Sequence, residues 1–201
     1  RTLPVASGIG GGSSDAAATL RALTRLWRIN IPEKECAGTA LALGADLPMC
    51  LAARTLRASG IGEALTEIRG LPSLAMVLAN PGVAVATPAV FSALAAKDNA
   101  PLPPLPRRPD FPALLAWLRE ARNDLEAPAR KIAPAAGDAL DALTHHGAAL
   151  ARMSGSGATC FGLFASRREA DAAAAALAAA RPSWYVTSTA TIERTGADGA
   201  H

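Results

Sequence analysis

The sequence contains no hydrophobic run long enough to cross a membrane and no concentrated block of positive charge. Arg, Asp or Gly interrupts each apolar stretch before it reaches the roughly 20 residues that a transmembrane helix needs. The formal net charge of +3 is small and the arginines are scattered along the chain, which suits an anionic small substrate better than nucleic acid. We therefore expect a soluble protein that binds neither a membrane nor nucleic acid.

Cysteines are few, and their spacing indicates neither a disulfide framework nor a metal site. Cys36, Cys50 and Cys160 lie far apart in apolar surroundings, with no C-x-x-C pair and an odd total. They are expected to be reduced and buried, as in a cytoplasmic protein. His145 and His146 are adjacent in a predicted helix and cannot share one of its faces, so we predict no metal-binding residues.

Half of the 201 residues are apolar, enough for a substantial core in one large domain or two small ones. Apolar positions at three- and four-residue spacing predict a helix over residues 14–27. Ser13, Ser14 and Asp15 are suitable caps for the start of that helix.

Further patterns along the chain predict an α+β fold, in which helices and strands alternate with few long parallel crossovers. Six prolines between residues 100 and 112 exclude a regular helix there and predict an extended surface connection. The other expected helices are residues 32–44, 111–122, 138–146 and 168–181, and the expected strands are residues 74–79, 148–153, 159–164 and 184–192.

The strongest local signal is a glycine run that precedes the first expected helix. Four glycines within residues 8–12 let the backbone fold tightly and present its N–H groups to an anion, beside the positive end of a helix. The hydroxyls of Ser13 and Ser14 can add contacts to phosphate oxygens or to a magnesium ion. A flexible glycine turn remains an alternative, since the spacing fits neither a Walker A nor a Rossmann motif.

Six sequence blocks, taken together, resemble the GHMP kinase family. Residues 3–17 resemble its glycine-rich phosphate-binding motif and residues 153–161 its third motif. The blocks between them agree in order with the branch of the family that phosphorylates 4-diphosphocytidyl-2-C-methyl-D-erythritol, and the resemblance extends from residue 3 to about residue 192. These blocks are residues 43–48, 60–63, 80–83 with 87–91, and 123–126.

This resemblance implies a fold, a reaction and its ligands. The expected fold is the α+β GHMP kinase fold, with residues 1–71 as part of a ribosomal-protein-S5-like ATP-binding domain and residues 72–201 as a ferredoxin-like C-terminal domain. The expected reaction transfers the γ-phosphoryl group of ATP, with Mg²⁺, to the 2-hydroxyl of the cytidine diphosphate substrate in non-mevalonate isoprenoid biosynthesis. The expected enzyme is a monomer or a homodimer.

The resemblance also implies the roles of individual residues. Asp46 is the expected catalytic residue, which accepts the proton of the substrate hydroxyl, and Phe91 is expected to stack on cytosine. Local sequence leaves alternatives open, namely a turn-capping Asp46, a core Phe91 and an ordinary glycine hairpin at residues 153–157. The expected ATP-binding residues are Pro4, Val5, Ala6, Ser7, Gly8, Ile9, Gly10, Gly11, Gly12, Ser13 and Ser14, and the expected substrate-binding residues are Asp46, Thr87, Pro88, Phe91, Gly155, Ser156 and Gly157.

One part of the family pattern has no counterpart in these residues. The family's opening segment carries a lysine near the γ-phosphate and an aromatic residue and a histidine that hold the cytidine, and Lys34, Lys97 and Lys131 do not replace that lysine by motif. We therefore expect that the protein has residues upstream of Arg1 and that residues 1–201 alone are inactive. Two alternatives are a homoserine- or mevalonate-type GHMP kinase and a nucleotide-binding module without catalysis.

Overall fold

The computed structural model describes residues 8–29 and 40–192, which form two compact units. Among these residues, the first unit contains residues 10–29 and 40–69, and the second contains residues 8–9 and 70–192. Each unit has a buried cluster of its own. The units are described separately below.

The first unit contains two packed helices, α1 (Gly11–Leu26) and α3 (Leu47–Ala52), and a hairpin of β1 (Leu56–Ser59) and β2 (Ala64–Glu67). Ala17 of α1 and Leu47 of α3 are buried together with Ala40. Arg21 strengthens the packing, because its Nη1 donates to the carbonyl oxygen of Cys50 at 2.9 Å. The two helices are thereby fixed relative to each other through both apolar and polar contacts.

Helix α1 begins earlier than the predicted start at residue 14. Gly10 takes a left-handed conformation, with φ of 66°, and its carbonyl oxygen accepts the Ser14 N–H at 2.8 Å. Ser13, Ser14 and Asp15 consequently lie inside the helix, so the prediction that they cap it is wrong. A glycine tolerates this left-handed backbone without the penalty that a Cβ atom would bring.

The hairpin β1–β2 was not among the predicted elements. Its strands pair antiparallel, with Leu56 opposite Glu67 and Ser59 opposite Ala64. Each strand has four residues, of which three are exposed, so neither shows the alternation of buried and exposed positions that would mark a strand. The expected end of the second helix is confirmed, since residues 40–43 are helical and Gly44 is not, whereas its start lies outside the described residues.

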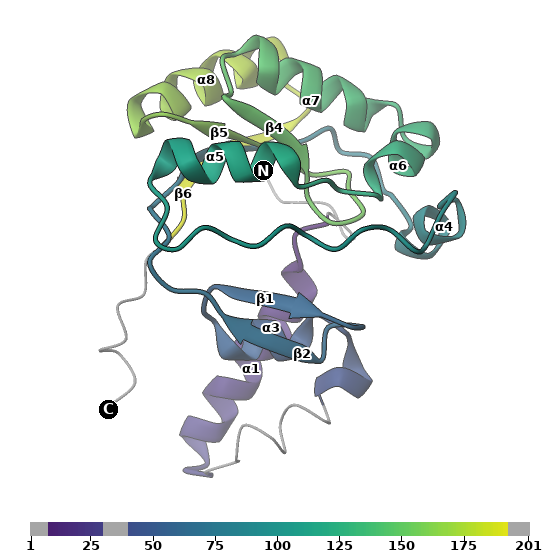
Figure 1. Cartoon of the computed structure of the whole chain (residues 1–201), viewed down its shortest axis with the longest axis vertical. Coiled ribbons are helices and arrows are strands. Elements are labelled where there is room, and N and C mark those ends of the chain that lie inside the picture. The colour runs from purple at the N-terminus through teal and green to yellow at the C-terminus, as the bar shows by residue number, and fades with distance from the viewer. Residues whose placement is uncertain (1–7, 30–39, 193–201) are drawn as a thin grey trace. The chain divides into compact units, whose positions relative to one another are not determined.

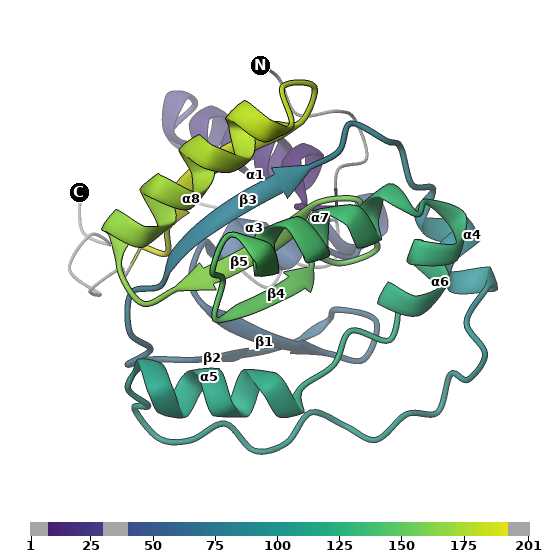
Figure 2. The same ribbon diagram turned by 90° about the horizontal axis from the view of Figure 1, so that it is seen from above.

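The second unit is built on a four-stranded antiparallel sheet with the strand order β4-β5-β3-β6. Helices α7 and α8 contact the sheet and cover the same face of it (Figures 1 and 2). This β-α-β-β-α-β arrangement is the ferredoxin-like topology, and it confirms the predicted α+β fold class. The elements are β3 (Ala75–Asn80), α7 (Ala135–His145), β4 (Leu150–Met153), β5 (Cys160–Phe164), α8 (Arg167–Ala180) and β6 (Tyr185–Ala190).

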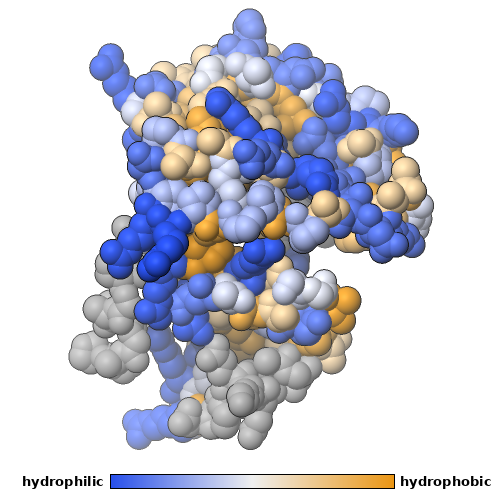
Figure 3. All heavy atoms as spheres, in the orientation of Figure 1, coloured by the Kyte–Doolittle hydropathy of each residue, from blue (hydrophilic) through white to orange (hydrophobic). Residues whose placement is uncertain are grey.

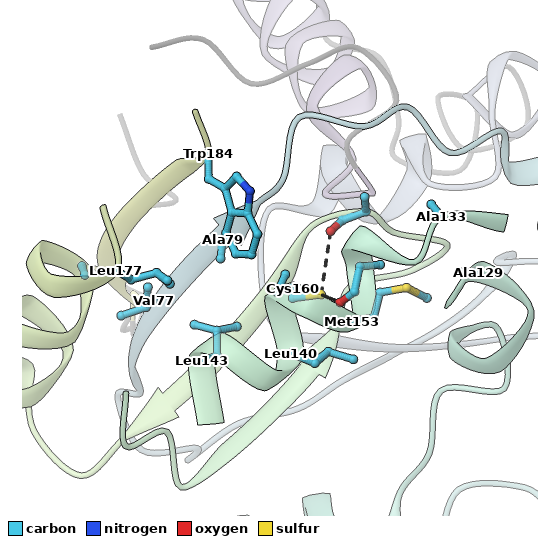
Figure 4. Close-up of a cluster of buried hydrophobic side chains, with 14 of the residues drawn as sticks. Val77, Ala79, Ala129, Ala133, Leu140, Leu143, Met153, Cys160, Leu177 and Trp184 are labelled. Carbon is cyan, nitrogen blue, oxygen red and sulfur yellow. Dashed lines mark hydrogen bonds between the residues drawn. The ribbon is translucent and has the colours of Figure 1, made fainter. Parts of the chain in front are cut away.

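Apolar side chains of the helices and the sheet pack together in the core of this unit. Val77 and Ala79 of β3, Leu143 of α7 and Leu177 of α8 are almost fully buried (Figure 4). The Cys160 thiol donates to the Ala136 carbonyl oxygen at 3.5 Å, and burial raises its pKa to about 12, so it stays protonated at neutral pH.

The expectation of buried cysteines therefore holds for one of the two that the structure describes. Cys160 is buried, Cys50 is only half-buried, and Cys36 lies outside the described residues. Cys50 lies on α3 and packs against the edge of the buried cluster of Ala17, Ala40 and Leu47.

Three further helices of the second unit flank an extended connection: α4 (Thr87–Ser92), α5 (Phe111–Glu120) and α6 (Glu126–Ile132). Residues 100–110 contain neither helix nor strand, as their prolines predict, and the chain runs between α4 and α5 as an extended trace (Figure 2). Trp117 Nε1 holds this connection by donating to the Pro103 carbonyl oxygen at 3.2 Å.

Hydrophilic residues cover much of the surface that Figure 3 shows, with apolar residues scattered among them. Among the described residues, no helix is both long enough and apolar enough to cross a bilayer.

Candidate functional site

The start of α1 presents backbone N–H groups that the helix itself cannot satisfy. The N–H groups of the first helical residues, Gly11, Gly12 and Ser13, have no carbonyl oxygen one turn earlier in the helix, and Gly10 offers no side-chain cap. These N–H groups lie at the positive end of the helix dipole. Together they can hold a phosphate group.

The first unit itself does not require glycine at positions 11 and 12. A Cβ atom on either residue would meet no atom within 4 Å, and neither residue has a left-handed backbone. Glycine in a helix costs about 1 kcal/mol relative to alanine. Without side chains at both positions, the backbone at the start of α1 is open to close approach by another molecule.

Asp46 immediately precedes α3 and is exposed to solvent. Asp46 occupies the N-cap position of α3, but its side chain makes no capping hydrogen bond with that helix, which gives no support to the alternative interpretation of Asp46 as a turn cap. Because α3 packs on α1 within the first unit, Asp46 and the amide groups at the start of α1 are carried by two helices in direct contact.

The hairpin that the sequence analysis missed supports the turn before Asp46. Gly62 has φ of 111°, and a Cβ atom there would lie 2.8 Å from the Ala45 carbonyl oxygen. Ile61 N–H donates to Glu63 Oε2 at 2.6 Å, which closes the turn around Gly62. Residues 60–63, identified above only as a sequence block, therefore pack against the backbone beside Asp46.

In the second unit, Gly8 is held against the turn between β4 and β5. Ser154 Oγ donates to the Gly8 carbonyl oxygen at 2.8 Å. A Cβ atom on Gly8 would lie 2.5 Å from the Gly157 oxygen and 2.7 Å from the Ser154 oxygen, so only glycine allows this approach. The contact joins the start of the glycine run to the turn that contains Gly155, which the sequence could not show.

Asn123 fixes the same turn from another side. Its Nδ2 donates to the carbonyl oxygens of Met153 and Gly155, at 3.0 and 2.8 Å, and its Oδ1 accepts the Leu125 N–H at 3.1 Å. Residues 123–126, identified above only as a sequence block, lead into α6, and the sequence did not indicate this role of Asn123. No local signal could have revealed it, because the two partners lie about thirty residues away.

Replacing Asn123 with Ala should loosen the turn at residues 154–157. The change removes both donors to the turn, and each lost hydrogen bond costs about 1 kcal/mol or more. We expect faster amide hydrogen exchange in this turn and a lower free energy of unfolding in urea. Asn99→Ala is the control, since Asn99 makes a single exposed 3.3 Å bond to Ala96, and equal effects of the two changes would contradict a specific role for Asn123.

Two predicted substrate residues meet through a hydrogen bond. Thr87, the first residue of α4, and Ser156 in the β4–β5 turn have their hydroxyl oxygens 2.8 Å apart. Two residues after this turn, Thr159 Oγ1 accepts a hydrogen bond from the buried side chain of Asn80 at 2.8 Å. The turn at residues 154–157 is thus bonded to several distant segments, which argues against an ordinary glycine hairpin.

Phe91 lies on α4 with 51% of its surface exposed. The alternative interpretation of Phe91 as a core residue is therefore wrong. Its ring lines an open cavity of about 780 Å³, together with Lys97, Arg122, Asn123 and Gly155. An exposed aromatic ring at the mouth of a cavity that also contains cations can bind a planar anionic ligand.

The structure thus brings Gly8 to the Ser154–Gly157 turn, Thr87 to Ser156, and Phe91 to a cavity shared with Gly155. Pro88 follows Thr87 in the first turn of α4 and is exposed. The remaining predicted nucleotide residues, Pro4, Val5, Ala6 and Ser7, lie outside the described residues.

Comparisons with known proteins agree with this geometry. Residues 1–54 match the family described as GHMP kinases N terminal domain, and residues 104–182 match the family described as GHMP kinases C terminal. A solved structure of 4-(cytidine 5'-diphospho)-2C-methyl-D-erythritol kinase is 33% identical, with a TM-score of 0.72 over 94% of this chain and 68% of that one. The chain belongs to the GHMP kinase family.

This GHMP kinase chain also matches curated relatives named 4-diphosphocytidyl-2-C-methyl-D-erythritol kinase. This chain is 53% identical to the relative from Chelativorans sp. (strain BNC1), over 95% of the 201 residues. It is 57% identical to the relative from Paracoccus denitrificans, over 92% of its own length. The chain spans 65% of the length of each of these relatives.

More distant GHMP kinase structures share the fold alone. Homoserine kinase from Cytophaga hutchinsonii is 17% identical with a TM-score of 0.63. Mevalonate kinase from L. major is 20% identical with a TM-score of 0.59. Identities this low indicate a common architecture and carry no conclusion about substrate.

Proposed function

We propose that this chain is part of an ATP-dependent kinase that phosphorylates the 2-hydroxyl of 4-diphosphocytidyl-2-C-methyl-D-erythritol, in the non-mevalonate route to isoprenoids. The observation that carries the proposal is the identity of 51–57% to relatives bearing this enzyme's name. In the proposal, residues 1–71 contribute to the nucleotide-binding domain and residues 72–201 form the C-terminal domain, and the reaction takes place in the cytoplasm.

The ATP phosphates are proposed to bind at the glycine run. The free N–H groups of Gly11, Gly12 and Ser13 at the start of α1, and the open space above the two glycines, fit a phosphate chain. Magnesium, bound to ATP, would neutralise part of the charge that develops during transfer. The described residues contain no group of three or more His, Cys, Asp or Glu side chains suited to a metal, which is compatible with a magnesium ion held chiefly by the nucleotide.

Asp46 is proposed to orient the substrate hydroxyl and to accept its proton. The carboxylate is exposed, makes no cap on α3, and is held on a helix that packs against α1. Phosphoryl transfer proceeds through a loose transition state, so the position of the hydroxyl contributes as much as the strength of the base. In this proposal, the close contact of Gly62 with Ala45 supports the backbone that precedes Asp46.

Phe91 is proposed to stack on the cytosine ring of the substrate. Thr87 and Pro88 form the preceding turn of the same helix, and the Thr87–Ser156 bond ties that helix to the β4–β5 turn. Lys97 and Arg122 line the same cavity as Phe91 and give it the positive charge that suits a diphosphate ester.

Phe91→Ala should raise the KM for the cytidine substrate and leave the KM for ATP close to its original value. Stacking of a base on an aromatic ring contributes about 1–3 kcal/mol, which corresponds to a rise of roughly 5- to 150-fold in KM. Phe91→Tyr, which keeps an aromatic ring, should retain most of the affinity. A parallel rise in both KM values would instead indicate a general loss of structure.

Activity can be tested in a chimera in which residues 1–201 replace the matching part of the Chelativorans relative. We expect magnesium-dependent transfer of phosphate from ATP to 4-diphosphocytidyl-2-C-methyl-D-erythritol. Homoserine and mevalonate serve as competing substrates for the two other GHMP kinase types. Phosphorylation of either of them, without turnover of the cytidine compound, would reject the proposed substrate.

A further inference from the structure

A second cavity in the second unit is lined by four arginines. It has a volume of about 620 Å³ and lies where the end of α5, the start of α6 and strand β4 meet. One carboxylate, that of Glu126, faces it. The arginines are Arg119, Arg122, Arg130 and Arg152.

Two of these arginines are already engaged in hydrogen bonds that fix the wall of the cavity. Arg119 Nη2 donates to the Ala149 carbonyl oxygen at 3.2 Å. Arg122 donates to Asp124 Oδ1 at 2.7 Å and to the Ala100 carbonyl oxygen at 2.8 Å. Their guanidinium groups therefore contribute positive charge from fixed positions.

The other two arginines have N–H groups that make no short hydrogen bond within the protein. Arg130 Nη1 is 3.8 Å from Glu126 Oε1, which is an ion pair without a short hydrogen bond. Arg152 is half-buried on β4, and its guanidinium makes no hydrogen bond or ion pair within 4 Å to another residue that the structure describes. Burial lowers the pKa of Arg152, and the Glu126 carboxylate partly opposes this effect.

A partly buried guanidinium with unsatisfied donors is costly unless an anion accompanies it. Arginine is charged at any physiological pH and presents a planar fork that binds phosphate through two parallel hydrogen bonds. The guanidinium groups of Arg130 and Arg152 line the same cavity, so each can bind one of two linked phosphate groups. A volume of about 620 Å³ is also in the range of small-molecule sites.

We propose that this cavity binds a phosphate-bearing small molecule, with a diphosphate group bridging Arg130 and Arg152. It shares Arg122 and Asn123 with the cavity at Phe91, but Arg130 and Arg152 line only the second cavity. Its lining contains no residue of the glycine run and neither Asp46 nor Phe91, so the phosphoryl transfer proposed above gives Arg130 and Arg152 no role. Asn123 lines this cavity and also bonds to the turn at Gly155. A bound diphosphate would therefore lie beside a residue that positions the β4–β5 turn.

Calorimetric titration of the 201-residue chain with inorganic pyrophosphate tests the proposal. We expect pyrophosphate to bind more tightly than orthophosphate, because it can occupy both forks at once. Arg152→Gln and Arg130→Gln should each weaken binding by about tenfold or more, the usual range for a lost charge-assisted hydrogen bond. Arg168→Gln on α8 is the matched control, since it removes one exposed positive charge from the same unit outside the cavity.

Glu126→Gln provides a test that misfolding cannot imitate. Among the described residues, Glu126 supplies the one carboxylate that lines the cavity, and its removal should strengthen pyrophosphate binding several-fold. The proposal is overturned if wild-type chain binds no pyrophosphate, or if Arg168→Gln weakens binding as much as Arg152→Gln does. It is also overturned if Gly11→Ala abolishes binding while Arg152→Gln does not, because the anion would then occupy the glycine run.

Discussion

Replacing Asp46 with Asn in the chimera is expected to lower the turnover number by about 10²–10⁴-fold, the usual contribution of a positioned proton acceptor. Asparagine keeps the size of the side chain and its ability to hydrogen-bond, but it cannot accept the proton of the substrate hydroxyl. The carboxylate is exposed and makes no cap on α3, so its loss should leave the stability of the first unit almost unchanged.

Steady-state kinetics and nucleotide titration separate the two possible roles of this residue. The affinity for ATP should stay close to its original value in Asp46→Asn, because the phosphates are assigned to backbone groups at the start of α1. Asp141→Asn is the control, since Asp141 is an exposed carboxylate on α7 in the other unit. Normal turnover by Asp46→Asn would show that Asp46 does not take part in the reaction.

The sequence predicted best those elements whose hydrophobic pattern is long or strongly apolar. Strand β3 and helix α8 lie close to their predicted ranges, because a run of buried side chains and a stretch of strong helix formers leave few alternatives. The hairpin β1–β2 was missed because most of its side chains are exposed. The early start of α1 was missed because Gly10, rather than a serine, ends the preceding loop in a left-handed conformation.

The residues of the candidate site also fall into two groups, those that the sequence indicated and those that only the fold revealed. The sequence indicated residues with a recognisable motif, such as Asp46 and Phe91, but it could not indicate residues that act through long-range contacts. Asn123 and Gly62 became visible only when the fold brought Asn123 to Gly155 and Gly62 to Ala45. The arginine-lined cavity belongs to the same class, because its members come from two helices, a connecting loop and a strand.

Gly11→Ala is expected to make the first unit more stable and, at the same time, to weaken ATP binding. A Cβ atom at residue 11 meets nothing within 4 Å, so the change should raise the free energy of unfolding by up to about 1 kcal/mol through helix propensity and a less flexible unfolded chain. The same methyl group would keep a phosphate from reaching the N–H groups of α1. A lost bond to a charged group corresponds to a fall of about 10- to 100-fold in affinity.

The opposite signs of these two effects make the experiment decisive, because a damaged fold would lower stability and affinity together. Urea unfolding and calorimetric titration of the chimera with ATP measure the two quantities. Ala22→Gly, on an exposed position of α1 away from its start, is the control with reversed sign: stability should fall by about 1 kcal/mol while ATP affinity stays constant. If Gly11→Ala binds ATP as tightly as the original protein, the glycines at the start of α1 are not there to admit a phosphate, and the nucleotide must be held elsewhere.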